Sequence, residues 1–200
     1  MRIFNNIILF VFISTSLFGQ NKLSEEELKI FQVRAVEYVS IFEFYIKQIA
    51  QSKSLESKNA DILAASNLFD EKATIEISNL NGTKRKLLLT DYLSKVVARY
   101  SEKYEVVVID FVAAKIENLK EKQDKNGKIY YEGTFKFVQH FYAERKSINS
   151  SSVENRKFTY GDVTHKKGKI ILKQVTTVIG DQWILKLGDI SVDETKPLDP

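Results

Sequence analysis

A long alternating run between residues 129 and 143 constrains the fold of this chain more than any other feature. Its odd positions are mostly apolar, while its even positions include Glu132, Lys136 and His140. Successive side chains of a β-strand point to opposite faces, so a period of two predicts a strand with one buried face. The run is far longer than an ordinary strand of about five or six residues. The odd side is therefore expected to face the core.

A helical pattern precedes the strands. Ser24 and Glu27 match the capping box, in which a hydroxyl and a carboxylate satisfy free N–H groups at a helix start. Apolar residues then recur every three or four positions as far as about Gln51, which predicts a long helix with one apolar face. A shorter helix is expected from Asn59, its predicted cap, and another after Thr90.

The remainder of the chain reads as strand, which makes the expected class α+β. The turn residues Asp124 to Gly127 should join two runs into a long antiparallel hairpin. Lys166–Lys169 is interpreted as either a turn or a bulge. Residues 194–200 are expected to be a flexible tail, because they are polar and hold both prolines. The expected strands cover residues 73–78, 84–89, 104–119, 128–144, 162–178 and 182–192.

Composition excludes several classes of site. The chain has no Cys, so disulfides, thiolate metal sites and cysteine nucleophiles are ruled out. Its two histidines, His140 and His165, are far apart in sequence, and no motif for a metal or a cofactor is found. Lys and Glu are interspersed, with 30 basic against 26 acidic residues, so no basic stripe for nucleic acid is expected.

The first 19 residues have the layout of a secretory signal peptide. Arg2 is followed by an apolar run from Ile7 to Ile13 and then by small residues before Gln20. The run is short for a bilayer span, and no second apolar segment follows it. We expect an exported protein, periplasmic or secreted, with no membrane span after cleavage. An uncleaved N-terminal anchor is the alternative.

The order of elements, with the phrases "FDEKATIEI" and "WILKLGDI", resembles the NTF2-like superfamily, which includes ketosteroid isomerase-like and SnoaL-like proteins. The resemblance covers nearly the whole chain after the signal and implies one domain over residues 24–193. It implies a cone-shaped, curved antiparallel sheet wrapped around a long N-terminal helix and two shorter helices. It also implies a pocket at the open end of the cone.

The inward faces of such a cone predict an apolar pocket with a few polar groups. Its expected lining is Tyr131, Phe135, Gln139, Gln174, Trp183 and Asp189. Asp189 ends the inward face of the last strand, where it is either a desolvated base or part of a fraying, solvated strand end. Asp110, within an apolar run, is either an inward acid or a bulge residue bonded to backbone.

The family resemblance leaves two functions open. We expect a non-catalytic binding or accessory module, whose partner is a small apolar ligand or another envelope protein. The alternative is an isomerase or dehydratase that uses Asp189 or Asp110 as a general base. The outward face of the long strand also predicts a possible homodimer surface, formed by Tyr130, Val138, His140 and Tyr142.

Overall fold

The computed structural model describes residues 22–117, 119–145, 159–178 and 180–198. The predicted signal peptide, 1–19, lies outside the described residues. The described helices are α1 (Glu25–Gln51), α2 (Leu55–Asn67), α3 (Leu89–Lys95), the short 3-10 helix η1 (Val97–Arg99) and α4 (Tyr100–Lys103). The strands are β1 (Thr74–Ser78), β2 (Lys84–Leu88), β3 (Tyr104–Ile116), β4 (Lys120–Gln123), β5 (Ile129–Arg145), β6 (Thr159–Thr177) and β7 (Gly180–Pro197).

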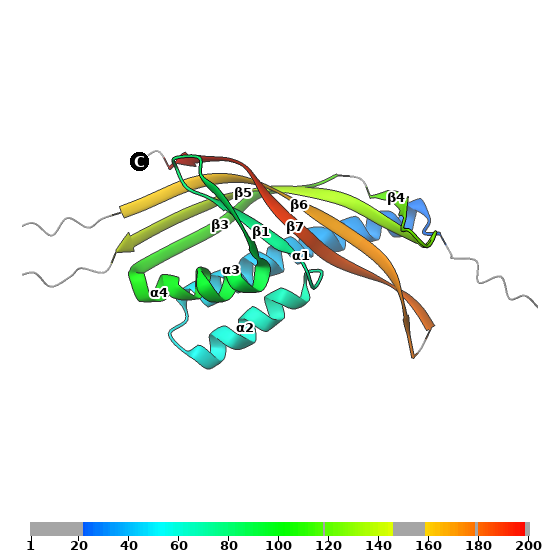
Figure 1. Ribbon diagram of the computed structural model, residues 1–200, viewed down its shortest axis with the longest axis horizontal. Coiled ribbons are helices and arrows are strands. Elements are labelled where there is room, and N and C mark those ends of the chain that lie inside the picture. The colour runs from blue at the N-terminus through cyan, green and yellow to red at the C-terminus, as the bar shows by residue number, and fades with distance from the viewer. Residues whose placement is uncertain (1–21, 118, 146–158, 179, 199–200) are drawn as a thin grey trace, which may run out of the picture.

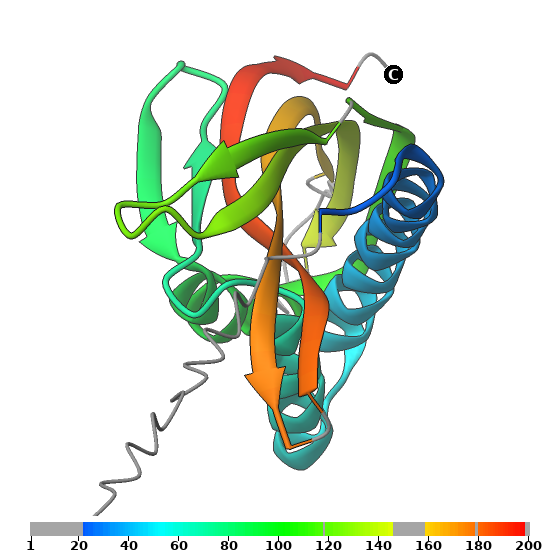
Figure 2. The same ribbon diagram turned by 90° about the vertical axis from the view of Figure 1, so that its right-hand side faces the viewer.

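The strands form one bent sheet, and the helices lie on its concave side (Figures 1 and 2). The strand order is β2-β1-β7-β6-β5-β3, with β4 also paired to β5. Antiparallel pairing prevails, but β1 runs parallel to β7. The predicted α+β fold with a curved sheet is confirmed. None of the helices in the described ranges is long and apolar enough to cross a membrane.

Helix α1 begins where the sequence predicted. Glu27 N–H donates to Ser24 Oγ at 3.3 Å, and Ser24 N–H donates to Glu27 Oε2 at 2.8 Å, which completes the capping box. Its buried face is apolar and includes Ala35, Val39, Phe42, Ile46, Ile49 and Ala50. The other helix starts differ from prediction: α2 is capped by Ser54 rather than Asn59, and α3 starts at Leu89 without a side-chain cap from Thr90.

Helix α1 also covers the outer edge of β3, the last strand of the sheet. Glu43 Oε1 accepts from Phe111 N–H at 3.0 Å, and Gln51 Nε2 donates to the Val107 carbonyl at 3.3 Å. These bonds satisfy backbone groups that no neighbouring strand pairs. Lys47 donates to Asp110 and Glu43, each at 2.8 Å, and these bonds raise the pKa of its ammonium.

Asp110 therefore matches neither interpretation of the sequence. It lies in regular pairing opposite His140, and the register shifts of β3 fall elsewhere. Its side chain is 49% exposed and forms an ion pair with α1. The prediction of an inward acid or a bulge at this position is wrong, because Asp110 pairs with the outward-facing His140 and its carboxylate binds Lys47 at the edge of the sheet.

Strand β6 is continuous through Lys166–Lys169, so neither a turn nor a bulge occurs in it there. One register shift precedes Lys166 and a second falls at Lys169, between Gly168 and Ile170, and in each of them the extra residue belongs to β7. Such an added residue bends a strand and increases its twist. The bends that curve this part of the sheet are therefore built into β7.

The predicted tail is wrong for residues 194–197. They continue β7 and pair with β6, for example Thr195 with Thr164 and Pro197 with Asp162. Leu198 N–H then donates to the Gly161 carbonyl at 3.1 Å. The polar composition of this segment suits a strand with an exposed face, and its Pro sits at the strand end, where a missing N–H is tolerated.

The inner face of the sheet includes one close approach of backbone and ring. Phe135 of β5 is opposite Gly168 of β6, and both are buried. A Cβ placed on Gly168 would lie 2.2 Å from Phe135 Cζ. The glycine is required here because the aromatic ring covers its backbone.

We expect Gly168→Ala to destabilise the protein by about 1–3 kcal/mol, because the Phe135 ring must leave its packed position. Urea unfolding of the variant measures the loss. Phe135→Leu in the same background should recover part of it, so the double-mutant cycle is strongly non-additive. Additive effects would mean that the ring and the glycine do not constrain one another.

Candidate functional site

The predicted pocket residues of β5 all face inward. Tyr131, Phe135 and Gln139 are 3%, 0% and 8% exposed. A strand rises about 3.3 Å per residue, so Tyr131 and Gln139 are about 26 Å apart along β5. They lie at different ends of the inner face and do not form one small site.

The Tyr131 end is closed by the chain itself. Tyr131 Oη accepts from Leu23 N–H at 3.0 Å, and its ring centroid is 5.3 Å from that of Trp183. Gln174 is half-buried and borders a separate surface hollow of about 450 Å³, together with Tyr130 and Lys173. The structure thus brings Tyr131 and Trp183 together and places Gln174 opposite Trp183 in the pairing of β6 with β7, whereas Gln139 lies at the other end of the inner face.

The middle of the inner face is packed with aromatic rings. Phe135 stacks on Phe137 with centroids 5.7 Å apart, and Phe137 lies 4.4 Å from Phe111. Phe42 of α1 meets the ring of Phe69 edge-on at 4.7 Å. Contact between a ligand and Phe135 would require displacement of these rings.

Asp189 does not point into the cone. It belongs to the bulge of β7 between the pairs Gly168–Ile190 and Ile170–Leu187, which turns it to the outer face. Its Oδ1 accepts from Thr74 N–H at 2.9 Å and from Thr74 Oγ1 at 2.6 Å. Partial burial opposes ionisation, but these bonds and the nearby Lys86 and Lys169 lower the pKa of Asp189. Both the inward acid and the fraying strand end were wrong, because the bulge shifts the alternation by one residue.

A cluster of buried polar residues occupies the other end of the inner face. We call it the polar cluster: Tyr92, Gln139, Asp162, Thr164 and Lys166, none more than 8% exposed. Asp162 Oδ1 accepts from Thr164 Oγ1 at 3.0 Å. Lys166 Nζ lies 5.8 Å from the ring centroid of Tyr92. Gln139 was predicted to face inward, whereas Asp162, Thr164 and Lys166 were not singled out.

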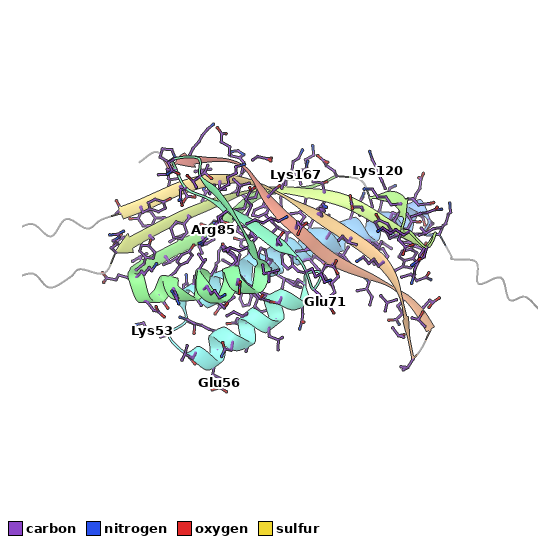
Figure 3. All side chains as sticks on the ribbon, viewed as in Figure 1. Lys53, Glu56, Glu71, Arg85, Lys120 and Lys167 are labelled. Atoms are coloured by element: carbon purple, nitrogen blue, oxygen red, sulfur yellow. The ribbon has the colours of Figure 1, made fainter. Side chains whose placement is uncertain are left out.

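A signal for these residues was present in the sequence. Gln174, an even position of β6, was predicted to face inward, and the same alternation read backward places Lys166, Thr164 and Asp162 on that face. The abundance of lysine in this stretch instead suggested that its side chains are exposed to solvent. Its two faces differ: Lys166 is buried, whereas Lys167 points away from the helices on the outer side of the sheet (Figure 3).

Burial shifts the pKa of both charged members of the polar cluster toward their neutral forms. Burial lowers the pKa of Lys166 to about 8, and the charge of Asp162 opposes this only in part. Burial raises the pKa of Asp162, against hydrogen bonds from Thr164 and Tyr160 and the charge of Lys166. Burial likewise raises the pKa of the Tyr92 hydroxyl. The polar cluster thus combines an amine and a carboxyl with unusual proton affinities.

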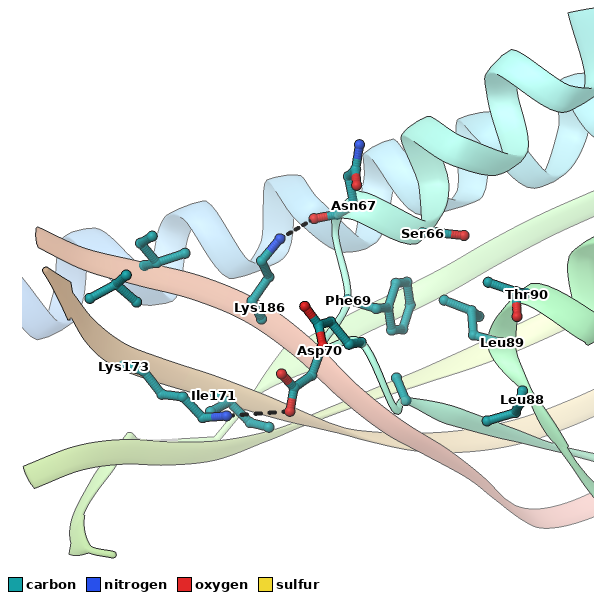
Figure 4. Close-up of a pocket in the computed structure, with 14 residues that line it drawn as sticks. Ser66, Asn67, Phe69, Asp70, Leu88, Leu89, Thr90, Ile171, Lys173 and Lys186 are labelled. Atoms are coloured by element: carbon teal, nitrogen blue, oxygen red, sulfur yellow. Dashed lines mark hydrogen bonds and ion pairs between the residues drawn. The ribbon is translucent and has the colours of Figure 1, made fainter. Parts of the chain in front are cut away.

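A groove of about 490 Å³ lies outside the cone, between the α2–β1 connection and the outer face of β6 and β7 (Figure 4). Its apolar walls include Leu88, Ile171, Val175 and Ile184. Its polar groups include Asp70 and Lys173, which form an ion pair at 3.3 Å, and Lys186, which donates to the Asn67 carbonyl.

The predicted homodimer residues lie on the outer face as expected. Tyr130, Val138, His140 and Tyr142 are half-buried, and Tyr142 donates to Glu144 Oε1 at 2.8 Å. On the neighbouring strand β3, the valines at 106, 108 and 112 are 38%, 41% and 45% exposed. Association of two chains through this face stays a prediction. Among the residues that the structure describes, no group of three acidic or histidine side chains could hold a metal ion.

No family model matches the sequence, and no curated protein matches it either. Solved structures do. An NTF2-like superfamily protein from Salmonella enterica is 10% identical with a TM-score of 0.45, over 86% of this chain and 94% of that one.

Two further similar structures carry provisional enzyme names. A scytalone dehydratase from Novosphingobium aromaticivorans is 10% identical with a TM-score of 0.41, over 88% and 93% of the chains. An NTF2-like family dehydratase from Streptomyces avermitilis is 10% identical with a TM-score of 0.41, over 86% and 99%. In fold, this chain resembles NTF2-like proteins. The likeness concerns the fold alone, and the enzyme names belong to those proteins.

The lowered pKa of Lys166 predicts a pH-dependent stability. Between about pH 8 and its usual pKa of 10.5, the unfolded chain binds more protons than the folded one, so the penalty of Lys166 disappears as the pH rises. Lys166→Met lacks this gain. From pH 7 to pH 10 its stability should therefore fall by about 2 kcal/mol relative to the parent, at about 1.4 kcal/mol per pKa unit.

Urea unfolding at several pH values measures this difference. Lys167→Met, on the exposed side of the same strand, is the matched control and should follow the parent at every pH. The same pH trend in both variants would contradict a shifted Lys166.

Proposed function

We propose that this chain is an exported, non-catalytic binding module that takes a small, largely apolar ligand in the groove of Figure 4. One observation carries the proposal, namely that a groove of about 490 Å³ keeps large apolar side chains exposed to solvent. Leu88 and Val175 on its walls are 50% and 41% exposed. Known ligand pockets hold about 300–1,000 Å³, with mostly apolar walls and few polar groups.

The polar groups of the groove suggest the form of the ligand. The Asp70–Lys173 ion pair and Lys186 share the lining of the groove with the apolar side chains of Ile171 and Ile184. An apolar body would cover the isoleucines and Val175, while one polar substituent would interact with a lysine ammonium. The expected ligand is therefore amphipathic, with a small polar or anionic end.

The alternative function is an isomerase or dehydratase with an inward Asp as general base. Asp189 and Asp110 do not suit this role, since the first is held by Thr74 on the outer face and the second by Lys47 at the sheet edge. Asp162 is the buried carboxyl of the polar cluster and would be the base in that case. The binding reading is preferred because the groove is open and the inner face is packed.

The groove can be tested with anilinonaphthalene sulfonate, a fluorescent probe that has an apolar body and one anionic group. We expect saturable binding to the folded protein, and Val175→Glu should weaken it at least tenfold by placing a carboxylate in the apolar wall. Fluorescence titration measures both. Val178→Glu, at a fully exposed valine outside the groove, is the matched control. Equal weakening by the two variants would place the probe elsewhere.

Export is tested separately. Expressed in a bacterium with its first 19 residues, the protein should be recovered from the periplasm or the medium, with a new N-terminus near Gln20. Without those residues it should stay in the cytoplasm. Cell fractionation and N-terminal sequencing measure the outcome, and a full-length chain retained in the membrane fraction would favour the uncleaved anchor.

A further inference from the structure

The polar cluster is separate from the groove and contains a buried amine and a buried carboxyl. The inner side of β6 carries four polar residues in succession, whose exposed fraction falls from the strand end inward. Tyr160 is 38% exposed, Asp162 8%, Thr164 5% and Lys166 4%. This row leads from the surface to a buried amine beside the ring of Tyr92 of α3, and both α3 and α4 lie on the concave side of the sheet (Figure 1).

The groups around Lys166 come from several elements. Tyr92 of α3 offers its ring to the ammonium at 5.8 Å, and Asp162 acts on it electrostatically. Thr164 Oγ1 lies 3.0 Å from Asp162 Oδ1 and 3.1 Å from Thr195 Oγ1 of β7. Tyr100 of α4 also interacts electrostatically with Asp162. The amine is thus enclosed by one carboxyl, hydroxyls and aromatic rings.

Gln139 adds an unmet polar group. It pairs with Thr164 across the sheet and is 8% exposed. Within the described residues its Oε1 is buried and has no hydrogen-bond partner. A buried acceptor left unpaired costs about 1–3 kcal/mol, so a small molecule that donates to it would be favoured.

We propose that Lys166 forms a reversible imine with small aldehydes or ketones that enter along β6 from Tyr160. The Nζ lone pair attacks the carbonyl carbon, the C=O π bond breaks, and the alkoxide that forms takes one proton from the attacking nitrogen to give a neutral carbinolamine. The carbinolamine hydroxyl then takes a second proton from Asp162. Water leaves, a C=N bond forms, and the remaining proton on nitrogen returns to Asp162. Atoms and charge balance without an added oxidant or reductant.

The protonation states fit this reaction. With a pKa of about 8, about one Lys166 in ten is a free amine at pH 7, against about one in three thousand at the usual 10.5. Burial also raises the pKa of Asp162, which favours the protonated acid that must donate. The carbinolamine hydroxyl could donate to Gln139 Oε1 as it forms.

The test is reductive labelling of the full chain with propanal and cyanoborohydride at pH 7, followed by peptide mass spectrometry of each lysine over time. Lys166 should acquire the propyl group at least tenfold faster than its exposed neighbours Lys167 and Lys169. In urea the three rates should converge. Labelling of Lys166 no faster than Lys167 in the folded protein would overturn the proposal, since a merely buried lysine reacts last.

Variants distinguish the contribution of the Asp162 carboxyl from that of the Lys166 amine. Asp162→Asn should slow the labelling of Lys166 several-fold and leave Lys167 unchanged, whereas Lys167→Arg should leave Lys166 as fast as in the parent. The unmodified protein gives the decisive rate ratio, so the result does not depend on any variant that fails to fold. An Asp162→Asn variant that is folded by circular dichroism and labels Lys166 at the parent rate would remove Asp162 from the mechanism.

Discussion

The burial of one whole face of β5 beneath the helices is the constraint on which the rest of this structure depends. The inward residues of β5 from Ile129 to Ala143 are all buried, and β5 pairs with β3, β4 and β6. More than one helix covers a face of that length: Phe141 of β5 packs against Tyr100 of α4, with ring centroids 5.1 Å apart. Helix α1 lies along β3 and satisfies the edge of that strand through Glu43 and Gln51.

The sequence was sufficient for elements whose pattern is local. The alternation of β5 and the capping box at Ser24 each predicted the observed structure, because a period of two or a hydroxyl–carboxylate pair acts over a few residues. The prediction for Asp189 was wrong because the face of this residue is not decided by a local pattern. Its face depends on an extra residue in the pairing of β7 with β6, and a register shift between strands leaves no periodic mark in the sequence.

Lys166 was missed through a second limit of sequence interpretation. A run of lysines usually indicates solvent, and Lys167 and Lys169 are indeed exposed. The position of Lys166 follows from continuity of β6, which could be inferred only by deciding between a turn and a strand at Gly168. That glycine serves a packing role beneath Phe135 rather than a turn role. The uncertainty at this one glycine therefore hid three of the five residues of the polar cluster, Asp162, Thr164 and Lys166.

The inner face of the sheet is divided into an aromatic half and a polar half, and the division decides how function can arise. Around Phe135 and Phe137 the rings fill the space between sheet and helix, so a ligand gains little there without displacing them. Around Lys166 the side chains are equally buried but carry protons that shift with pH. A buried amine contributes less stability than an apolar side chain of similar volume, so its value to the fold is poor. What distinguishes this end is a buried amine and a buried carboxyl with shifted pKa values, whereas exposed apolar side chains line the groove outside.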